Sequence, residues 1–169
     1  MTFASIADSI AIQNEMPWDK RDVPATIYQM LRQTTDKFGA RPAITFQLQS
    51  GATDKAETLS WQQFHDQVCQ MANLFRSLRV GENDVVALVL PNCNETAVAT
   101  IAAMVAGIAN PINPLLEPEQ IGAILRETKA KVVVTLKAFP KTDIAQKCAE
   151  AVRHAPSVHT VLEIDLNRY

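Results

Sequence analysis

Residues 84–136 constrain the fold more than any other part of the chain, because two strongly apolar runs flank two helical segments there. The run VVALVL at 85–90 is apolar at every position, which is typical of a strand covered by helices on both faces. The run KVVVTL at 131–136 is also predominantly apolar and predicts a second buried strand. Between them, residues 97–106 lack a polar face and predict a helix buried nearly all round, while Pro118 suits the first position of a second helix. Strands separated by helices predict βαβ crossovers and a mostly parallel sheet flanked by helices.

The connection between these two helices is rich in proline. The segment ANPINPLLEP at 109–118 contains three prolines, which supply no amide hydrogen to a helix or to a sheet ladder. We therefore expect this segment to be irregular and to form neither a helix nor a central strand. At the start of the preceding helix, Asn92 with Glu95 three residues later predicts an N-cap, and Gly107 predicts the helix end.

The residues before this core predict a helix followed by a hairpin. A helical period runs over residues 25–38. Apolar and polar side chains then alternate over residues 44–48, as expected for a half-exposed strand. The run KAETL can return as the second strand, so we expect a small β-hairpin near residues 43–59.

The clearest helix signal follows this hairpin. Ser60 and Gln63 have the spacing of a capping box, in which each residue accepts a hydrogen bond from the backbone of the other. Leu59 and Phe64 occupy the two positions of a hydrophobic staple. A single apolar stripe continues from there, and Gly81 is placed to end the helix.

The two ends of the chain have weaker patterns. Residues 1–22 show no sustained period, so we expect an arm with little regular structure that docks Trp18 on the domain formed by residues 23–169. Residues 140–155 predict an amphipathic helix, and the run VHTVLEI predicts a third apolar strand. The final LNRY contains no cap or turn signal.

Composition argues against several classes of protein. A formal net charge of −2 gives no electrostatic attraction to nucleic acid or to an acidic membrane. The cysteines Cys69, Cys93 and Cys148 are too widely spaced for a zinc motif or a disulfide framework. The first residues do not resemble a signal peptide, and no apolar window reaches the roughly 20 residues of a transmembrane helix. We therefore expect a cytoplasmic protein without a transmembrane segment.

The residues themselves do not reveal an active site. His154 and His159 are separated by a helix break at Pro156, and no carboxylate or thiol completes a metal set around them. With His65, they are expected to be surface or capping residues. Cys93 lies in a predicted first helical turn, where the pKa of a thiol can be lowered, but no base is adjacent in sequence.

Phosphate binding usually needs a glycine-rich turn whose backbone amides surround the anion. The chain has only 5 glycines, and no two have the spacing of a GxGxxG or GxxxxGK[ST] motif. We therefore assign no catalytic, cofactor-binding or metal-binding residue, and we expect no cofactor to be bound by this chain itself.

Three runs occur in a fixed order. The first run resembles T-(Y/W)-x-E-(L/F), a helix, then G-(V/L)-x-x-G-D-x-V-A, with Asn83 where the family usually has glycine; it reads TLSWQQFHDQVCQMANLFRSLRVGENDVVALVLPN. The second run resembles a pattern containing A-G-A-x-x-x-P-(L/V)-N-P; it reads ETAVATIAAMVAGIANPINPLLEPEQIGAIL. The third run, KVVVT, resembles the strand that follows. Residues 24–50 match an opening that ends in F-G-x-R-P-A-I. The series, over roughly 24–136, resembles the adenylate-forming superfamily of acyl-CoA synthetases, luciferases and peptide-synthetase adenylation domains.

This resemblance implies the N-terminal subdomain of an acyl-CoA synthetase-like fold. The full-length enzymes convert a carboxylic acid and ATP, with magnesium, to an acyl-AMP, from which coenzyme A displaces AMP. Their phosphate loop and other catalytic signatures would lie downstream of Tyr169, so no catalytic residue is carried over. We expect a fragment of a fatty-acid–CoA ligase that is inactive alone. Its partners are the remainder of its own enzyme and, through an exposed apolar face, further copies of itself.

The alternative is a free-standing α/β binding module of flavodoxin-like or regulatory type. Its ligand would be held by loops at the strand ends, such as Pro91–Asn92. No acidic cluster or glycine turn in the sequence supports it.

Overall fold

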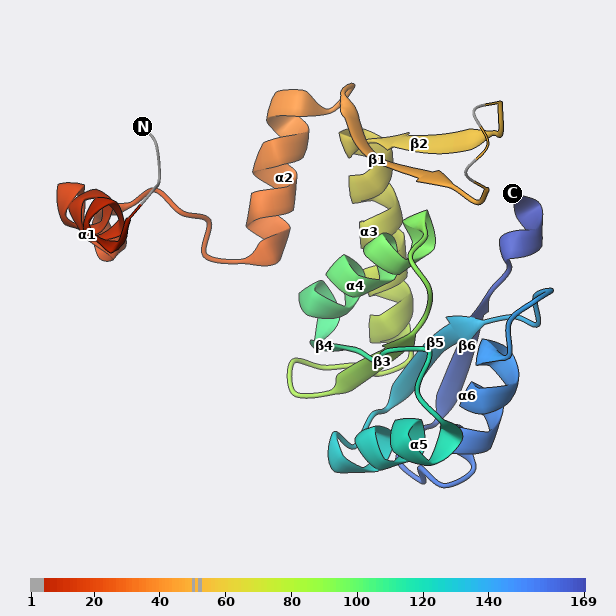
Figure 1. Cartoon of the computed structure of the whole chain (residues 1–169). Helices are drawn as coiled ribbons and strands as arrows, with labels where there is room; N and C mark the ends of the chain where they lie inside the picture. Colours follow the sequence, from red (N-terminus) through yellow and green to blue (C-terminus); the bar gives the residue numbers. More distant parts are fainter. Residues whose placement is uncertain (1–4, 50, 52) are drawn as a thin grey trace.

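A computed structural model describes residues 5–49, 51 and 53–169. Its centre is a four-stranded parallel sheet in the order β4-β3-β5-β6 (Figure 1). The strands are β3 Val85–Val89, β4 Ile108–Pro111, β5 Val132–Leu136 and β6 Thr160–Ile164. Every residue of β5 is buried, and in β3 only the first residue is partly exposed. The two strongly apolar runs therefore form the two central strands, as expected for strands covered on both faces.

Helices cover both faces of this sheet (Figure 1). They are α2 Ile27–Phe38, α3 Trp61–Ser77, α4 Asn94–Ala106, α5 Pro118–Glu127 and α6 Ile144–Val152. α4 lies on the sheet with α3 and α2 packed against it, while α5 and α6 pack together on the other face. The predicted α/β class is confirmed. The expectation that α4 is buried nearly all round is wrong at Met104, which is 45% exposed because this side of α4 faces solvent.

The β-hairpin predicted near residues 43–59 is also confirmed. β1 Pro42–Gln47 and β2 Ala56–Ser60 pair in antiparallel fashion, with Ile44 opposite Leu59. Both strands contact α3, and Leu59 is buried against it. Residues 50 and 52 of the connecting loop lie outside the described residues.

α3 begins as predicted and ends differently. Ser60 Oγ accepts a hydrogen bond from the amide of Gln63 (3.2 Å), and Gln63 Oε1 accepts one from the amide of Ser60 (2.9 Å). The helix ends at Ser77, and Arg79 adopts the left-handed φ of 62°. Gly81 is therefore not the residue that ends α3, because Arg79 makes the turn first.

The start of α4 differs from the prediction by one residue. Asn92 is the predicted N-cap, but the N-cap is Cys93, whose backbone is extended, and the helix begins at Asn94. The turn is held by Thr96, whose hydroxyl donates to the carbonyl oxygen of Pro91 (2.5 Å). This contact spans the whole turn, so it fixes the helix start in place of a side-chain cap.

The proline-rich segment begins with an edge strand, where irregular structure is predicted from the sequence. Residues 108–111 form β4, and the amides of Ile108 and Ile112 donate to carbonyl oxygens before and within β3, each at 2.9 Å. Because alternate amides point to opposite sides of a strand, the nitrogen of Pro111 faces the open edge. Its missing hydrogen therefore removes no ladder bond. The expectation of irregular structure is wrong here, although β4 is an edge strand and not a central one.

The expectation of an irregular N-terminal arm is wrong for its described part. Residues 6–15 form the helix α1, and Trp18–Lys20 form the 3-10 turn η1. Both ends of α1 are satisfied locally: Ser5 caps its start, and the Arg21 guanidinium donates to two carbonyl oxygens near its end, at 2.8 and 3.2 Å. No residue of α1 is buried, and Trp18 is 75% exposed, so it does not dock on the sheet domain. Residues 1–4 lie outside the described residues.

The last residues of the chain are also ordered by a local cap. The Asp165 carboxylate accepts a hydrogen bond from the amide of Asn167 (2.9 Å) and starts the 3-10 turn η2, Leu166–Arg168. Leu166 is buried. The run LNRY itself contains no cap signal because the capping residue comes directly before it.

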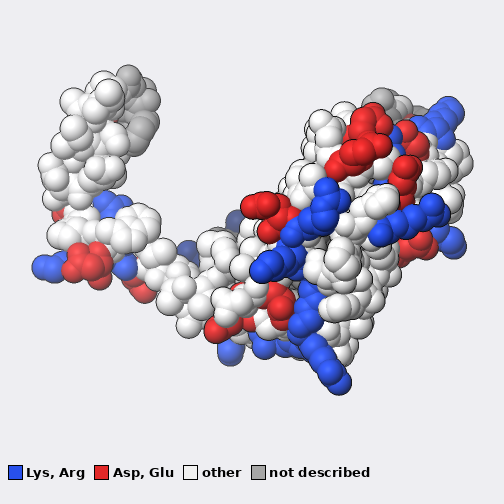
Figure 2. Space-filling model, turned by 90° about the horizontal axis from the view of Figure 1, so that it is seen from below, with Lys and Arg blue, Asp and Glu red and all other residues white. Residues whose placement is uncertain are grey.

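The sequence predicts no electrostatic attraction to nucleic acid or to an acidic membrane, and no transmembrane segment. Figure 2 shows lysine and arginine side chains interleaved with aspartate and glutamate on the face that it presents. Such mixing produces no strong field of one sign over the described residues of that face. None of the helices in the described part of the chain combines the length and the apolar character needed to cross a membrane.

Candidate functional site

The candidate site lies at the carboxyl ends of the parallel strands. From β3 the chain crosses to β4 on one side, and from β5 it crosses to β6 on the other side. Because crossovers are right-handed, this reversal places α4 and α6 on opposite faces, as Figure 1 shows. Open α/β sheets bind ligands in the crevice outside the strand ends at such a reversal.

Three distant parts of the chain meet beside these strand ends. They contribute Glu57 from β2, Glu95 from the first turn of α4, and Arg168 and Tyr169 from the end of the chain. We call these four residues the carboxyl-end cluster. Sequence separations of 73 residues between Arg168 and Glu95 and of 111 residues between Arg168 and Glu57 show that only the tertiary fold assembles it.

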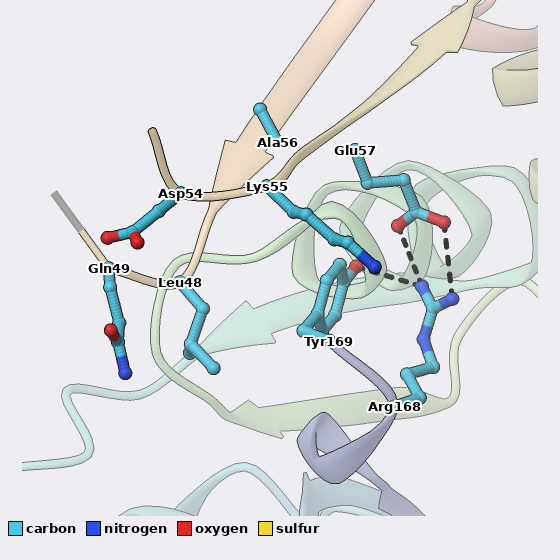
Figure 3. Close-up of a pocket in the computed structure, with 8 residues that line it drawn as sticks. All are labelled: Leu48, Gln49, Asp54, Lys55, Ala56, Glu57, Arg168 and Tyr169. Atoms are coloured by element: carbon cyan, nitrogen blue, oxygen red, sulfur yellow. Dashed lines mark hydrogen bonds and ion pairs between the residues drawn. The ribbon is translucent and has the colours of Figure 1, made fainter. Parts of the chain in front are cut away.

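Arg168 lies between the two carboxylates. Its guanidinium donates to both oxygens of Glu57, at 3.2 and 2.9 Å, in the forked geometry that arginine forms with carboxylates (Figure 3). Its Nε donates to Glu95 Oε1 at 2.7 Å, and one of its terminal nitrogens also contacts that oxygen. Tyr169 donates its hydroxyl hydrogen to Glu95 Oε2 at 2.9 Å, while its ring packs edge-on to Phe46 with 4.9 Å between centroids.

Asn94 fixes this cluster to the core. It is only 3% exposed, and its side-chain amide donates to the backbone carbonyl (3.1 Å) and to the carboxylate (3.2 Å) of Glu57. This amide joins the hairpin to the start of α4. It therefore positions a residue of β2 against the carboxyl end of the sheet.

The cluster shifts the protonation equilibria of its members. Burial alone would raise the pKa of Glu57, but hydrogen bonds from Tyr169, Arg168 and Asn94 together hold that pKa below its ordinary value. Burial raises the pKa of Tyr169, and its hydrogen bonds to Glu57 and Glu95 raise it further. Burial would lower the pKa of Arg168, but its bonds to Glu95 and Glu57 raise it overall. At neutral pH the cluster therefore contains a carboxylate at Glu57, a neutral phenol and a guanidinium.

An open cleft of about 460 Å³ lies next to the cluster (Figure 3). Its walls come from the hairpin on one side and the chain end on the other. The lining residues are Leu48, Gln49, Asp54, Lys55, Ala56, Glu57, Arg168 and Tyr169. The wall is thus mixed in polarity, and its arginine is already paired with two carboxylates.

The cysteine and histidine candidates lie apart from this cleft. Cys93 is buried at the start of α4, and burial raises its pKa, which is the opposite of the lowering expected at a helix N-terminus. His154 and His159 are exposed. His65 is different: its side chain is only 18% exposed and lies beside Asp66 and Cys69 on α3.

Neither the carboxyl-end cluster nor the His65 group is among the sites predicted from the sequence. The group had a local signal, because a histidine and a cysteine four positions apart share one face of a helix. The cluster had none, since its contacts are long-range. No set of three or more histidine, cysteine, aspartate or glutamate side chains within the described residues of one chain could hold a metal ion.

Comparison with known proteins identifies the fold family. The family described as AMP-binding enzyme matches residues 31–168, most of the chain. The chain belongs to the AMP-binding enzyme family. This AMP-binding chain is 31% identical over 145 residues to the marinolic acid–CoA ligase of Pseudoalteromonas sp. (strain SANK 73390), covering 86% of this chain and 22% of that protein. It is 32% identical over 122 residues to a probable peroxisomal acyl-activating enzyme 12 of Arabidopsis thaliana, covering 72% and 20%.

Solved structures show the same fold. The anthranilate–CoA ligase AuaEII, in complex with anthranoyl-AMP, superposes with a TM-score of 0.71 at 18% identity, covering 88% of this chain and 26% of that one. The N-terminal domain of FACL13 from Mycobacterium tuberculosis superposes with a TM-score of 0.66 at 23% identity, covering 82% and 33%. The AMP-binding chain described here spans about a fifth of the length of the curated relatives that it matches.

Proposed function

We propose that this chain is the N-terminal part of an ATP-dependent acyl-CoA synthetase that activates a carboxylic acid, with residues 23–169 as its first α/β subdomain and residues 1–22 as an arm. The observation that carries the proposal is the reversal of strand order between β3 and β5, in a chain whose relatives include named acid–CoA ligases. Glu57, Arg168 and Tyr169 of the carboxyl-end cluster line the neighbouring cleft.

In the proposed parent enzyme, a carboxylate oxygen of the acid attacks the α-phosphate of ATP, releasing pyrophosphate and forming acyl-AMP. The sulfur of coenzyme A then attacks the acyl carbon, and AMP leaves. The described residues do not fit ATP or Mg²⁺ by themselves, because Arg168 is already paired with Glu57 and Glu95 and no glycine-rich turn is present. We therefore assign this chain the role of a scaffold and a crevice wall, and we propose that it is inactive alone.

We propose a medium or long fatty acid as the substrate. The support is the run NPINPLLEPEQI, which resembles acyl-CoA synthetases more than peptide-synthetase domains. Among the relatives, the named acids differ: one is a marinolic acid–CoA ligase, one a peroxisomal benzoate–CoA ligase and one an acetyl-coenzyme A synthetase. A cytoplasmic location stays a prediction from the sequence.

We also propose that the chain packs on the rest of its enzyme through apolar surface, and that the isolated chain self-associates through it. Several large apolar side chains are exposed on the sheet domain, among them Met30, Met104, Ile108 and Leu115. An apolar groove of about 500 Å³ also runs between α2, α3 and α4. Light scattering of the isolated chain should show species larger than a monomer; a monodisperse monomer at high concentration would contradict this part of the proposal.

The decisive test is acid-dependent exchange of radiolabelled pyrophosphate into ATP, with acetate, benzoate, octanoate and palmitate compared in parallel. We expect no exchange by the 169-residue chain and exchange by the full-length gene product, greatest with octanoate or palmitate. Exchange by the short chain would overturn its proposed inactivity. A full-length product that exchanges with none of the acids would overturn the ligase assignment, and one that prefers acetate or benzoate would overturn the fatty-acid proposal.

A further inference from the structure

Residues 5–23 carry a large share of the exposed apolar side chains. Among the described residues, 12 large apolar side chains are exposed, and five of these lie in residues 5–23: Ile6, Ile10, Met16, Trp18 and Val23. Ile6 and Ile10, one turn apart on α1, are 81% and 51% exposed. The match to the AMP-binding family begins at residue 31, so this segment lies outside it. Exposed apolar surface of this kind is typical of a contact with another protein surface.

α1 and η1 form one unit, which we call the arm. The guanidinium of Arg21 donates to the carbonyl oxygens of Ile12 (2.8 Å) and Met16 (3.2 Å), near the end of α1. The same guanidinium lies 5.8 Å from the centroid of the Trp18 ring. The arm can therefore bind a surface as a preformed element, and little chain entropy is lost when it does so.

The linker between the arm and α2 is short. The start of α2 is fixed by Thr26, whose hydroxyl oxygen accepts a hydrogen bond from the amide of Gln29 at 3.1 Å. Pro24 restricts Val23 to an extended backbone. Figure 1 shows α1 directed away from the sheet domain. Short hinge segments favour the exchange of an element between two copies of a chain over its return to its own domain.

The groove of about 500 Å³ between α2, α3 and α4 is suited to apolar side chains. Its walls come from all three helices and include Ile27, Leu31, Trp61, Phe64 and Ile101. Its two hydroxyl groups are satisfied within their own helices, because Thr34 donates to the Met30 carbonyl (2.8 Å) and Thr100 donates to the Thr96 carbonyl (2.7 Å). None of the described residues that line it is charged. The groove therefore has no feature that would recognise a polar ligand.

The charges of the neighbouring helices favour the arm as the occupant. α1 carries Asp8 and Glu15 and no basic residue. α2, which forms one wall of the groove, carries Arg32 and Lys37 against a single acidic residue, Asp36. A helix with an acidic surface is thus attracted to the side of the groove that α2 forms.

We propose that two copies of the chain exchange arms, so that Ile6 and Ile10 of each copy fill the groove of the other. A two-fold axis relates the two contacts, so both grooves are filled and no open contact remains to extend a filament. The inference narrows the self-association proposed above to one pair of surfaces, and it does not depend on ligase activity. Met104, Ile108 and Leu115 stay available for contact with the rest of the enzyme.

The test is the oligomeric state of the 169-residue chain, measured by light scattering and sedimentation over a range of concentrations. We expect a monomer–dimer equilibrium. Ile10→Asp in the arm and Met30→Asp in the groove should each raise the dissociation constant more than about ten-fold, because each places a charge in an apolar contact. These side chains are 51% and 48% exposed, so circular dichroism of both variants should match the parent chain. Met104→Asp, at a methionine that is 45% exposed and outside the groove, should leave the dissociation constant unchanged.

A mixture of the two defective variants separates exchange from other arrangements. In an exchanged dimer, the intact arm of the Met30→Asp chain fits the intact groove of the Ile10→Asp chain. An equimolar mixture should therefore recover dimer, held by one of the two contacts. A mixture that stays monomeric would overturn the exchange. Association of the parent chain that survives both substitutions would also overturn it, while leaving self-association through another surface. A parent chain that stays monomeric would overturn both.

Tryptophan fluorescence provides a second readout, because Trp61 lines the groove. In the Trp18→Phe variant, Trp61 is the only tryptophan. Its emission should shift to shorter wavelength, and its quenching by iodide should decrease, as the concentration rises through the monomer–dimer transition. Adding Ile10→Asp to this variant should remove both changes. A transition that leaves the emission of Trp61 unchanged would contradict filling of the groove.

Discussion

The two central strands and the carboxyl-end cluster are parts of one fold that are held together by different forces. In β5, Val133 and Val134 are completely buried, and the one polar side chain, Thr135, donates its hydroxyl to the Val89 carbonyl at 3.2 Å. Such a region is sensitive to lost volume and insensitive to pH or salt. The cluster instead depends on charge-assisted hydrogen bonds between half-exposed side chains. Its contribution to the free energy of unfolding should therefore be smaller than that of the strands and should depend on pH and salt.

The largest expected effect comes from the central strands. Leu88→Ala in β3 should lower the free energy of unfolding by about 2–5 kcal/mol, because it leaves a cavity at a side chain that is 2% exposed. Urea denaturation followed by circular dichroism measures this change. The matched control is Leu115→Ala, at a leucine that is 78% exposed, where the change should stay within about 0.5 kcal/mol. Equal losses in both variants would contradict the burial assigned to β3.

Asn94 joins the two regions, so replacing it should cause the second-largest loss in the free energy of unfolding. Asn94→Ala removes a buried amide that donates to the carbonyl of Glu57, and should cost about 1–3 kcal/mol. The same denaturation experiment applies, with the exposed Asn73→Ala in α3 as the control. If Asn94→Ala matched its control, the hairpin would not be fixed to α4 through this side chain.

Replacing Arg168 should lower the free energy of unfolding by less than a truncation in the core and by more than the loss of an ordinary surface charge. Arg168→Met leaves two carboxylates facing each other and should cost about 1–2 kcal/mol, the value for charged hydrogen bonds reduced for a half-exposed side chain. Arg32→Met, which removes only an exposed contact to Asp36 at 4.0 Å, should cost less than about 0.5 kcal/mol. Added salt should shrink the Arg168 effect; a loss independent of salt would mean that packing and not charge holds the chain end.

The smallest expected effect is a change in how the free energy of unfolding depends on pH. The pKa of Glu57 is lowered below 4.5 in the folded chain, so its contribution is fully present above pH 4.5 and is lost as pH falls through the folded value. The stability difference between the parent chain and Glu57→Gln should therefore be largest at neutral pH and shrink in acid. Denaturation at several pH values measures it, with Glu82→Gln as an exposed control. A difference that grew in acid would reverse the sign assigned to Glu57.

Local signals in the sequence were enough for the sheet and for the start of α3. A strongly apolar run indicates burial on both faces, and the Ser60–Gln63 box is complete within four residues, so neither signal depends on distant parts of the chain. α1 and β4 were missed for different reasons. α1 has no buried residue in the described part of the chain and lacks an apolar period, and its end is satisfied by Arg21, which lies beyond the helix. β4 contains a proline that is tolerated only because the strand lies at an edge.

The candidate site was less predictable than the fold. Glu57, Glu95 and Arg168 become neighbours only when the hairpin, α4 and the chain end come together, and no spacing in the sequence reports that event. The family resemblance supplied the correct fold class, but it rests on residues that build the frame. The side chains that line the cleft lie largely outside the matched motifs.

Pro111 also determines the direction in which this sheet can grow. On the open side of β4, the row of backbone donors is interrupted because Pro111 has no amide hydrogen. A new strand paired there would therefore lack one backbone hydrogen bond. β6, at the opposite edge, has the sequence TVLEI and no such gap. An additional strand, whether from a longer polypeptide or from another molecule, should therefore extend the sheet beside β6 and leave the β4 edge as its permanent border.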